Sequence, residues 1–179
     1  TLRRWVVNAH PKDFTCKVNE DKMGLLCDNF DHLKNKNQKE DGADDELGKI
    51  RAIRLCKDKD LKHIACGDSC GYLWVFDAET MGLVSINETH QNEILGCEYT
   101  PVSDFREKRN QILATCSKDH SVKLFDAKEN YEEIKSIHDH DSAVIGIKFV
   151  EDEKDPDIKL VSADAKGKVS IRSIDEELN

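Results

Sequence analysis

The sequence predicts an all-β chain built from a repeated four-stranded unit, because it aligns with itself in two separate places. Residues 63–77 match residues 112–126 without a gap at an offset of 49, and a third copy follows at 159–173. Independently, residues 90–99 match residues 140–149 at an offset of 50. Two alignments with nearly the same period indicate a structural repeat.

Within each copy, the pattern of apolar residues predicts four short strands and little helix. An alternating strand comes first, a strand of small apolar residues second and another alternating strand third, followed by a weaker fourth strand. The first strands are predicted around residues 50–55, 94–99 and 144–149, and the second strands at 64–67, 112–116 and 160–163. The third strands are predicted at 73–76, 122–125 and 169–171, and two fourth strands at 82–86 and 133–137. Four antiparallel strands in each 40-odd residues are typical of a β-propeller blade.

The repeat divides the chain into about three and a half four-stranded blades of an incomplete ring. Leu2 to Trp5 match the third strand of a blade, so the chain starts in the middle of a strand. We therefore expect an open arc with apolar end surfaces, closed by further residues of a longer chain or by a second polypeptide. The expected parts are the end of a preceding blade at 1–8, a partial outer strand with a long flexible insertion at 9–48, and blades at 49–89, 90–138 and 139–179.

Charged and polar residues predict where the insertions lie. The longest stretch with little apolar character is 29–45, which cannot bury enough surface to order itself. Shorter charged inserts fall at 103–110 and 151–157, in both cases between the first and second strands of a blade.

The clearest copy resembles the WD repeat, a family of β-propeller proteins. It has His90 before the first strand, Ser117-Lys-Asp119 after the second, and Leu124-Phe-Asp126 at the end of the third. The resemblance implies that His90, Ser117, Asp119 and Phe125 form a buried polar chain within one blade. Because these residues recur with the repeat, we interpret them as structural and not as a catalytic His-Ser-Asp triad.

The other two blades depart from this motif. The position of Asp119 holds Cys70 in the first full blade and Lys166 in the last, and Arg172 replaces the aromatic residue in the last. We therefore expect the full polar chain to be absent from both of these blades, leaving their apolar strands to hold them together.

Longer stretches resemble the mitogen-activated protein kinase-binding protein family, which includes a spindle-pole protein linked to microcephaly. The resemblance lies in residues 65–75, 90–99, 124–131 and 140–149, in that order. It implies a large scaffold protein in signalling or in spindle and centrosome assembly. The kinase-docking segments of that family lie outside the propeller, so the resemblance does not carry kinase binding to this chain. WD-repeat proteins of ciliary axonemes share the same blade pattern, and a structural role in a cytoskeletal assembly remains the alternative.

Composition narrows the function classes further. The net charge of −9 argues against a nucleic-acid-binding surface, and no apolar run approaches the roughly 20 residues that cross a bilayer. No signal peptide is recognisable, which favours a cytoplasmic protein. The family resemblance implies that it associates with the cytoskeleton, at a spindle pole, centrosome or cilium. The seven cysteines form no CxxC pair. A zinc site at His63, Cys66 and Cys70 is less favoured than reduced thiols in the core, and we expect no cofactor.

The sequence thus predicts a non-enzymatic platform for binding other proteins. The turns after the second strands and the linkers between blades are expected to share one face. The candidate partner-binding residues on that face are Glu88, Glu93, Lys118, His120, Asp139 and Asp141. Their acids and the nearby histidines are compatible with a pH-sensitive site for a basic partner or with an ordinary solvated rim.

Overall fold

The computed structural model describes residues 5–9, 16–20, 48–58, 60–101, 111–152 and 155–174. The chain divides into two compact units, Thr1–Asp45 and Glu46–Asn179. In the first unit, β1 (Trp5–Ala9) pairs antiparallel with β2 (Cys16–Glu20). The predicted insertion at 29–45, the insert at 103–110 and the start of the predicted strand at Leu2 lie outside the described residues.

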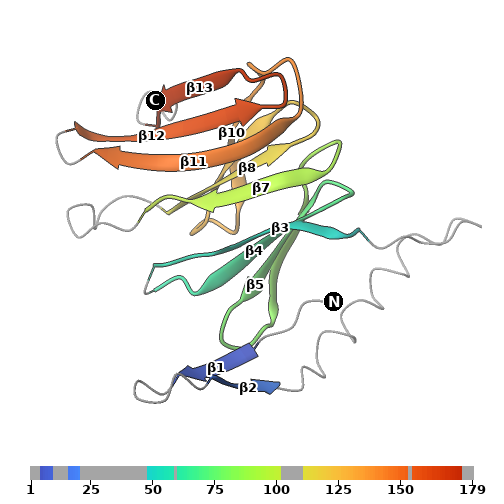
Figure 1. Ribbon diagram of the computed structural model, residues 1–179, viewed down its shortest axis with the longest axis vertical. Coiled ribbons are helices and arrows are strands. Elements are labelled where there is room, and N and C mark those ends of the chain that lie inside the picture. The colour runs from blue at the N-terminus through green and yellow to red at the C-terminus, as the bar shows by residue number, and fades with distance from the viewer. Residues whose placement is uncertain are drawn as a thin grey trace, which may run out of the picture. The chain divides into compact units, whose positions relative to one another are not determined.

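The second unit contains three antiparallel sheets, which we call blades 1, 2 and 3 (Figure 1). Blade 1 is β3 (Ile50–Leu55), β4 (His63–Asp68), β5 (Tyr72–Asp77) and β6 (Leu83–Glu88); blade 2 is β7 (Ile94–Tyr99), β8 (Ile112–Ser117), β9 (Val122–Asp126) and β10 (Glu132–Ile137); blade 3 is β11 (Val144–Asp152), β12 (Asp155–Asp164) and β13 (Val169–Ser173). The strands occur where the apolar alternation placed them, and the all-β fold class is confirmed.

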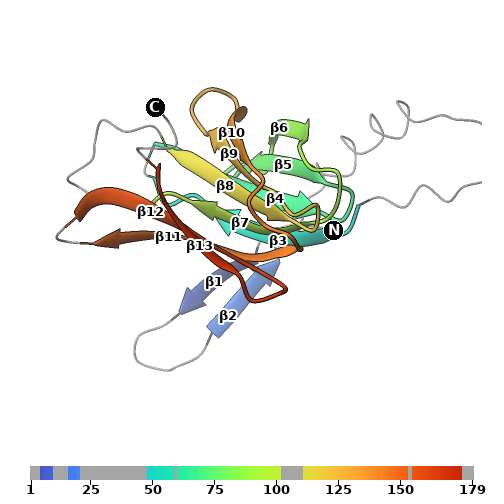
Figure 2. The ribbon, with the colours of Figure 1, turned by 90° about the horizontal axis from the view of Figure 1, so that it is seen from above.

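Blade 3 differs from the prediction in its first hairpin. Asp152 pairs with Asp155, so the stretch expected to be a charged insert at 151–157 continues the ladder between β11 and β12. The two strands are therefore longer than those of blade 2 (Figure 2). The ladder is formed by hydrogen bonds between backbone groups, which residues of any side-chain type except proline can supply in full.

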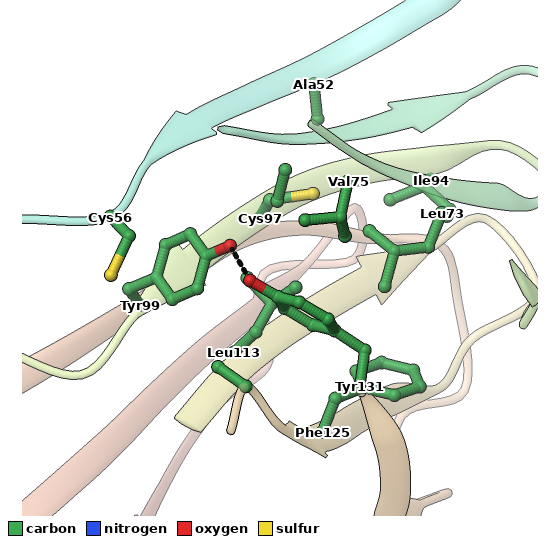
Figure 3. Packing of buried hydrophobic residues seen from close by; sticks show 12 residues of the cluster. Ala52, Cys56, Leu73, Val75, Ile94, Cys97, Tyr99, Leu113, Phe125 and Tyr131 are labelled. Carbon is green, nitrogen blue, oxygen red and sulfur yellow. Dashed lines mark hydrogen bonds between the residues drawn. The ribbon is translucent and has the colours of Figure 1, made fainter. Parts of the chain in front are cut away.

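Two apolar clusters join the blades, and β8 contributes to both. Leu113 packs with Tyr99, Phe125 and Tyr131 between blades 1 and 2 (Figure 3). Ala114 and Cys116 belong to a second cluster between blades 2 and 3. All six residues of β8 are buried, because successive side chains point to opposite faces of the strand and each face meets a neighbouring blade.

An ion-paired cluster connects the first strands of the three blades. Glu98 on β7 is buried and receives hydrogen bonds from Arg54 on β3, at 2.5 Å, and from Lys148 on β11, at 3.0 Å. One carboxylate thus joins three blades, and its own burial is compensated by two cations.

Large apolar side chains remain exposed at the two ends of this stack. Ile53 and Leu55 on β3 are more than half exposed, and so are Val169 and Ile171 on β13. Exposed apolar residues on the outer sides of blades 1 and 3 match the expectation that the blades form only an arc of a ring.

Candidate functional site: the loop face and its polar chains

The turns after the second strands lie beside the segments that lead into the first strands. Backbone hydrogen bonds of 2.9 Å join them, from Ser69 N to Lys49 O, from Lys118 N to Glu93 O and from Ala165 N to Ala143 O. The same contact therefore recurs in all three blades. We call residues 69–71, 89–93, 118–121, 138–143 and 165–168 the loop face.

Below this face, blade 2 contains a hydrogen-bonded chain centred on His90. The Nε2 atom of His90 lies 2.7 Å from the hydroxyl of Thr115, and Nδ1 lies 2.9 Å from Oδ2 of Asp119. Because a carboxylate can only accept, Nδ1 is the donor and Nε2 accepts from Thr115. Asp119 also accepts hydrogen bonds from the backbone of Gln91 and from both the backbone and hydroxyl of Ser121.

The structure brings His90 and Asp119 together but gives Ser117 a different partner. The buried Ser117 hydroxyl donates to the carbonyl of Asn92 and accepts from the backbone of Asp119. The partner of His90 is instead Thr115, two residues earlier on the same face of β8. Phe125 is buried in the cluster between blades 1 and 2. The sequence reasoning missed Thr115 and Ser121, although the alternation along β8 could have identified the first.

Electrostatics in this chain favour a neutral imidazole beside a charged carboxylate. Burial lowers the pKa of His90, and the nearby Asp119 offsets this only in part. Burial alone would raise the pKa of Asp119, but hydrogen bonds from Ser121 and the neighbouring His90 lower it to about 2. Four hydrogen-bond donors thus stabilise the charged form of the Asp119 carboxylate.

Blade 3 has its own polar chain, so the prediction that it lacks one is wrong. His140 Nε2 lies 2.7 Å from the Ser162 hydroxyl, and Nδ1 lies 3.2 Å from Oδ2 of Asp164. The other oxygen of Asp164 accepts from the backbone of Lys166 and Lys168. The acid stands at the end of β12, two residues before the turn position at which the motif places it.

Blade 1 also places its acid at the end of the second strand. Oδ1 of Asp68 accepts from the backbone of Cys70 and Tyr72, and Oδ2 accepts from Nε1 of Trp74 at 2.9 Å. The exposed Cys70 occupies the position at which blade 2 has Asp119. Each described blade therefore has one carboxylate that holds its turn, at the strand end in blades 1 and 3 and in the turn itself in blade 2.

Asp139, a candidate partner-binding residue, forms contacts within blade 3. Its Oδ2 accepts from Nη2 of Arg172 and from the hydroxyl of Ser170, each at 2.7 Å. Although partial burial acts to raise the pKa of Asp139, these two hydrogen bonds lower it below its ordinary value. Arg172, which replaces the aromatic residue of the motif, thus ties the linker before β11 to β13.

The other acidic candidates also lie near partners in the same chain. Glu88 accepts from the Tyr72 hydroxyl at 3.3 Å. Glu93 accepts from Arg51 at 3.1 Å and lies 3.9 Å from Lys118.

Asp141, with 83% of its side chain exposed, is 4.0 Å from Lys168. Glu88, Lys118 and His120 are also exposed, whereas Glu93 and Asp139 are partly buried. The loop face therefore carries both signs of charge and is not uniformly acidic.

Within the described residues, no group of three or more His, Cys, Asp or Glu side chains could hold a metal ion. No helix in this part of the chain is long and apolar enough to cross a membrane. Cys66 and Cys116 are buried in the core, and burial raises the pKa of each thiol to about 12. Such thiols stay protonated and pack as small apolar groups.

No protein-family model matches the chain. Among curated proteins, it is 25% identical to WD repeat-containing protein 62 of Sus scrofa over 142 residues, which are 79% of this chain and 9% of that protein. It is 26% identical to mitogen-activated protein kinase-binding protein 1 of Homo sapiens over 124 residues, 69% of this chain and 8% of that protein. It is 29% identical to nuclear distribution protein PAC1 of Fusarium vanettenii over 87 residues, 49% of this chain and 18% of that protein. The chain therefore spans less than a fifth of the length of these relatives.

Solved structures agree with the fold. The structure of U3-55K superimposes with a TM-score of 0.57 at 21% identity, covering 72% of this chain and 35% of that one. The WD40 repeats of RRP9 give the same TM-score and identity, with 72% and 34% covered. These similarities show the arrangement of blades alone. Taken with the curated relatives and the recurring turn geometry, they identify the chain as a WD-repeat protein whose blades form part of a WD40 propeller.

Proposed function

We propose that this chain is the platform of a non-enzymatic protein–protein interaction scaffold and that it contacts its partners through the loop face. The proposed setting is cytoplasmic and cytoskeleton-associated, in kinase signalling or in spindle and centrosome assembly. Similarity to mitogen-activated protein kinase-binding protein 1 and to WD repeat-containing protein 62 supports this setting. The proposed ligands are other proteins, and neither nucleic acids nor membranes are proposed as ligands.

The observation that carries the proposal is the support beneath each turn. Asp68, Asp119 and Asp164 each accept several hydrogen bonds from the backbone of their turns or linkers. The exposed side chains above them are therefore held on an ordered base. A partner that binds an ordered surface loses less conformational entropy at the interface, which favours binding through small sets of side chains.

The geometry of the polar chains also supports a role without catalysis. A nucleophile must reach a substrate, but the residues whose hydroxyls contact His90 or Asp119, namely Thr115, Ser117 and Ser121, are all buried. Their hydroxyls hydrogen-bond within the blade. A His-Ser-Asp set in this arrangement positions strands and turns.

The test compares the loop face with the turn at the opposite end of blade 2 in the full-length protein. Lys118→Glu and Asp141→Lys alter the loop face, whereas Lys128→Glu and Glu129→Lys alter the exposed turn at the opposite end of β9. After affinity purification from cells, partners that are identified with the wild type are quantified with each variant. The loop-face changes should reduce partner recovery about tenfold, and the control changes should leave it unaltered.

Equal recovery with all four variants would contradict the use of the loop face. The identity of the partners decides between settings. Mitogen-activated protein kinases or spindle-pole proteins would support the signalling or spindle scaffold. A set of axonemal proteins would instead favour the alternative of a structural component of the cytoskeleton.

A further inference from the structure

The turn of blade 2 contains an L-residue where the other blades have glycine. Gly71 and Gly167 have φ angles of 90° and 87°, and His120, which the repeat aligns with both, has φ of 72°. Only glycine adopts this left-handed region without a steric penalty from Cβ. The backbone of His120 is therefore strained in a way that glycine at the same position would relieve.

Other non-glycine residues with positive φ show how such strain is usually compensated. Met81 and Tyr131 have φ angles of 58° and 61°, and both side chains are buried, at 8% and 2% exposure. Asn130 at φ of 51° is a residue type that tolerates this region. His120 is exposed instead, and its ring has no hydrogen-bond partner in the part of the chain that the structure describes. Contacts of the side chain within the blade therefore do not compensate the backbone strain at His120.

The charges around His120 are arranged unequally between the blade and the solvent. Asp119 directs its carboxylate inward, where 12% of the side chain is exposed and four donors surround it. Glu93 is held by Arg51 at 3.1 Å. The ammonium group of Lys118 lies 3.9 Å from the other carboxylate oxygen of Glu93, yet 56% of the Lys118 side chain is exposed. The solvent side of this turn therefore presents the imidazole of His120 and a largely exposed ammonium group, which is paired with Glu93 only at 3.9 Å, while Asp119 faces inward and Glu93 is held more closely by Arg51.

We propose that Lys118 and His120 form a contact site for an acidic segment of a partner protein. This inference rests on the proposed function and names the chemistry that one part of the loop face recognises. A carboxylate of the partner accepts a hydrogen bond from the His120 ring and pairs with the Lys118 ammonium. The strained backbone of His120 is retained because it places the ring in solvent at the tip of the turn.

The test measures stability and binding on the same variants of the full-length protein. The probe is a fluorescein-labelled peptide in which glutamates alternate with glycines, followed by fluorescence anisotropy. His120→Gly should raise the Tm by roughly 2 °C, because strain is relieved, and weaken peptide binding about fivefold. Lys118→Gln should weaken binding about threefold with little change in Tm.

Two controls make the result specific. Lys128→Gln, in the turn at the other end of β9, should change neither the Tm nor the binding, and a peptide with glutamine in place of glutamate should not bind. The proposal is overturned if His120→Gly binds the acidic peptide as well as the wild type does, or if it lowers the Tm. Equal weakening by Lys128→Gln would also overturn it, since that result indicates general charge attraction. If His120→Gly binds the peptide normally while Asp141→Lys still loses the cellular partners, only this inference fails and the proposed function stands.

Discussion

Blades 2 and 3 both use a histidine to join the second strand to a carboxylate, but the carboxylate stands at a different position of the repeat in each blade. In blade 2, His90 bridges Thr115 on β8 and Asp119 in the turn. In blade 3, His140 bridges Ser162 on β12 and an acid at the end of that strand, Asp164. The histidine and the hydroxyl keep their positions in the repeat, and only the acid moves by two residues.

The difference shows that a carboxylate at either position can hold the turn. Asp164 accepts from the backbone two and four residues later, as Asp68 does in blade 1. In blade 2 the strand-end position is Ser117, whose hydroxyl accepts from the backbone of Asp119. Asp119 then supplies the charge for His90 and Ser121. The strand-end acid is also the deeper one, with 1% of its side chain exposed in Asp164 against 12% in Asp119.

The largest effect should follow from removing the histidine of blade 3. His140→Ala removes the partner of the buried Ser162 hydroxyl and of Oδ2 of the buried Asp164, and it opens a cavity, so the free energy of unfolding should fall by about 2–4 kcal/mol. Denaturant unfolding of the full-length protein measures this change. A loss below about 0.5 kcal/mol would mean that the chain in blade 3 contributes nothing.

A smaller loss is expected when the acid of blade 2 is removed. Asp119→Ala leaves donors of His90, Gln91 and Ser121 unsatisfied, and the free energy of unfolding should decrease by about 1–3 kcal/mol. The same denaturant titration applies. If Asp119→Ala proves as stable as the wild type, its four hydrogen bonds do not hold the turn.

Stability should also depend on pH in a defined direction. Burial lowers the pKa of His90 below its ordinary value of 6.5, so acidification through 6.5 protonates the unfolded chain first, and the free energy of unfolding decreases. A second decrease is expected between pH 3.8 and about 2, where Asp119 stays charged in the folded state only. Unfolding measured from pH 7.5 to pH 5, with and without His90→Asn, tests the first window. An identical pH dependence in the variant would rule out His90 as its source.

The smallest effects are expected at the positions that align with Asp119 in the other blades. Lys166→Ala and Cys70→Ala remove exposed side chains. In both blades the turn is held by the acid two residues earlier, so neither change removes its support. Each should change the free energy of unfolding by less than about 0.5 kcal/mol. A loss as large as that of Asp119→Ala would place the supporting group in the turn in every blade.

The sequence predicted the repeat and its strands because apolar residues alternate along most of them, and because β8, which is buried on both faces, is a run of small and apolar residues. It failed for the polar chain of blade 3, and it did not find the acid that holds the turn of blade 1, because the motif fixes one position for the acid. Asp68 and Asp164 stood two residues earlier, where the same backbone amides are within reach. The contact between Asp139 and Arg172 could not be predicted from the sequence either, because tertiary packing brings together two residues that are 33 positions apart.

Moving the carboxylate within blade 2 tests the equivalence of the two positions most directly. Asp119→Ala, Ser117→Asp and the double variant form a cycle with the wild type, and unfolding free energies are measured for all four. The new carboxylate at position 117 would face the backbone amides of residues 119 and 121, which correspond to the Lys166 and Lys168 amides that donate to Asp164 in blade 3. The account predicts that the double variant regains at least about half of the stability lost in Asp119→Ala, whereas Ser117→Asp alone destabilises by placing two carboxylates together. A double variant less stable than Asp119→Ala would contradict the claim that a carboxylate at either position can hold the turn.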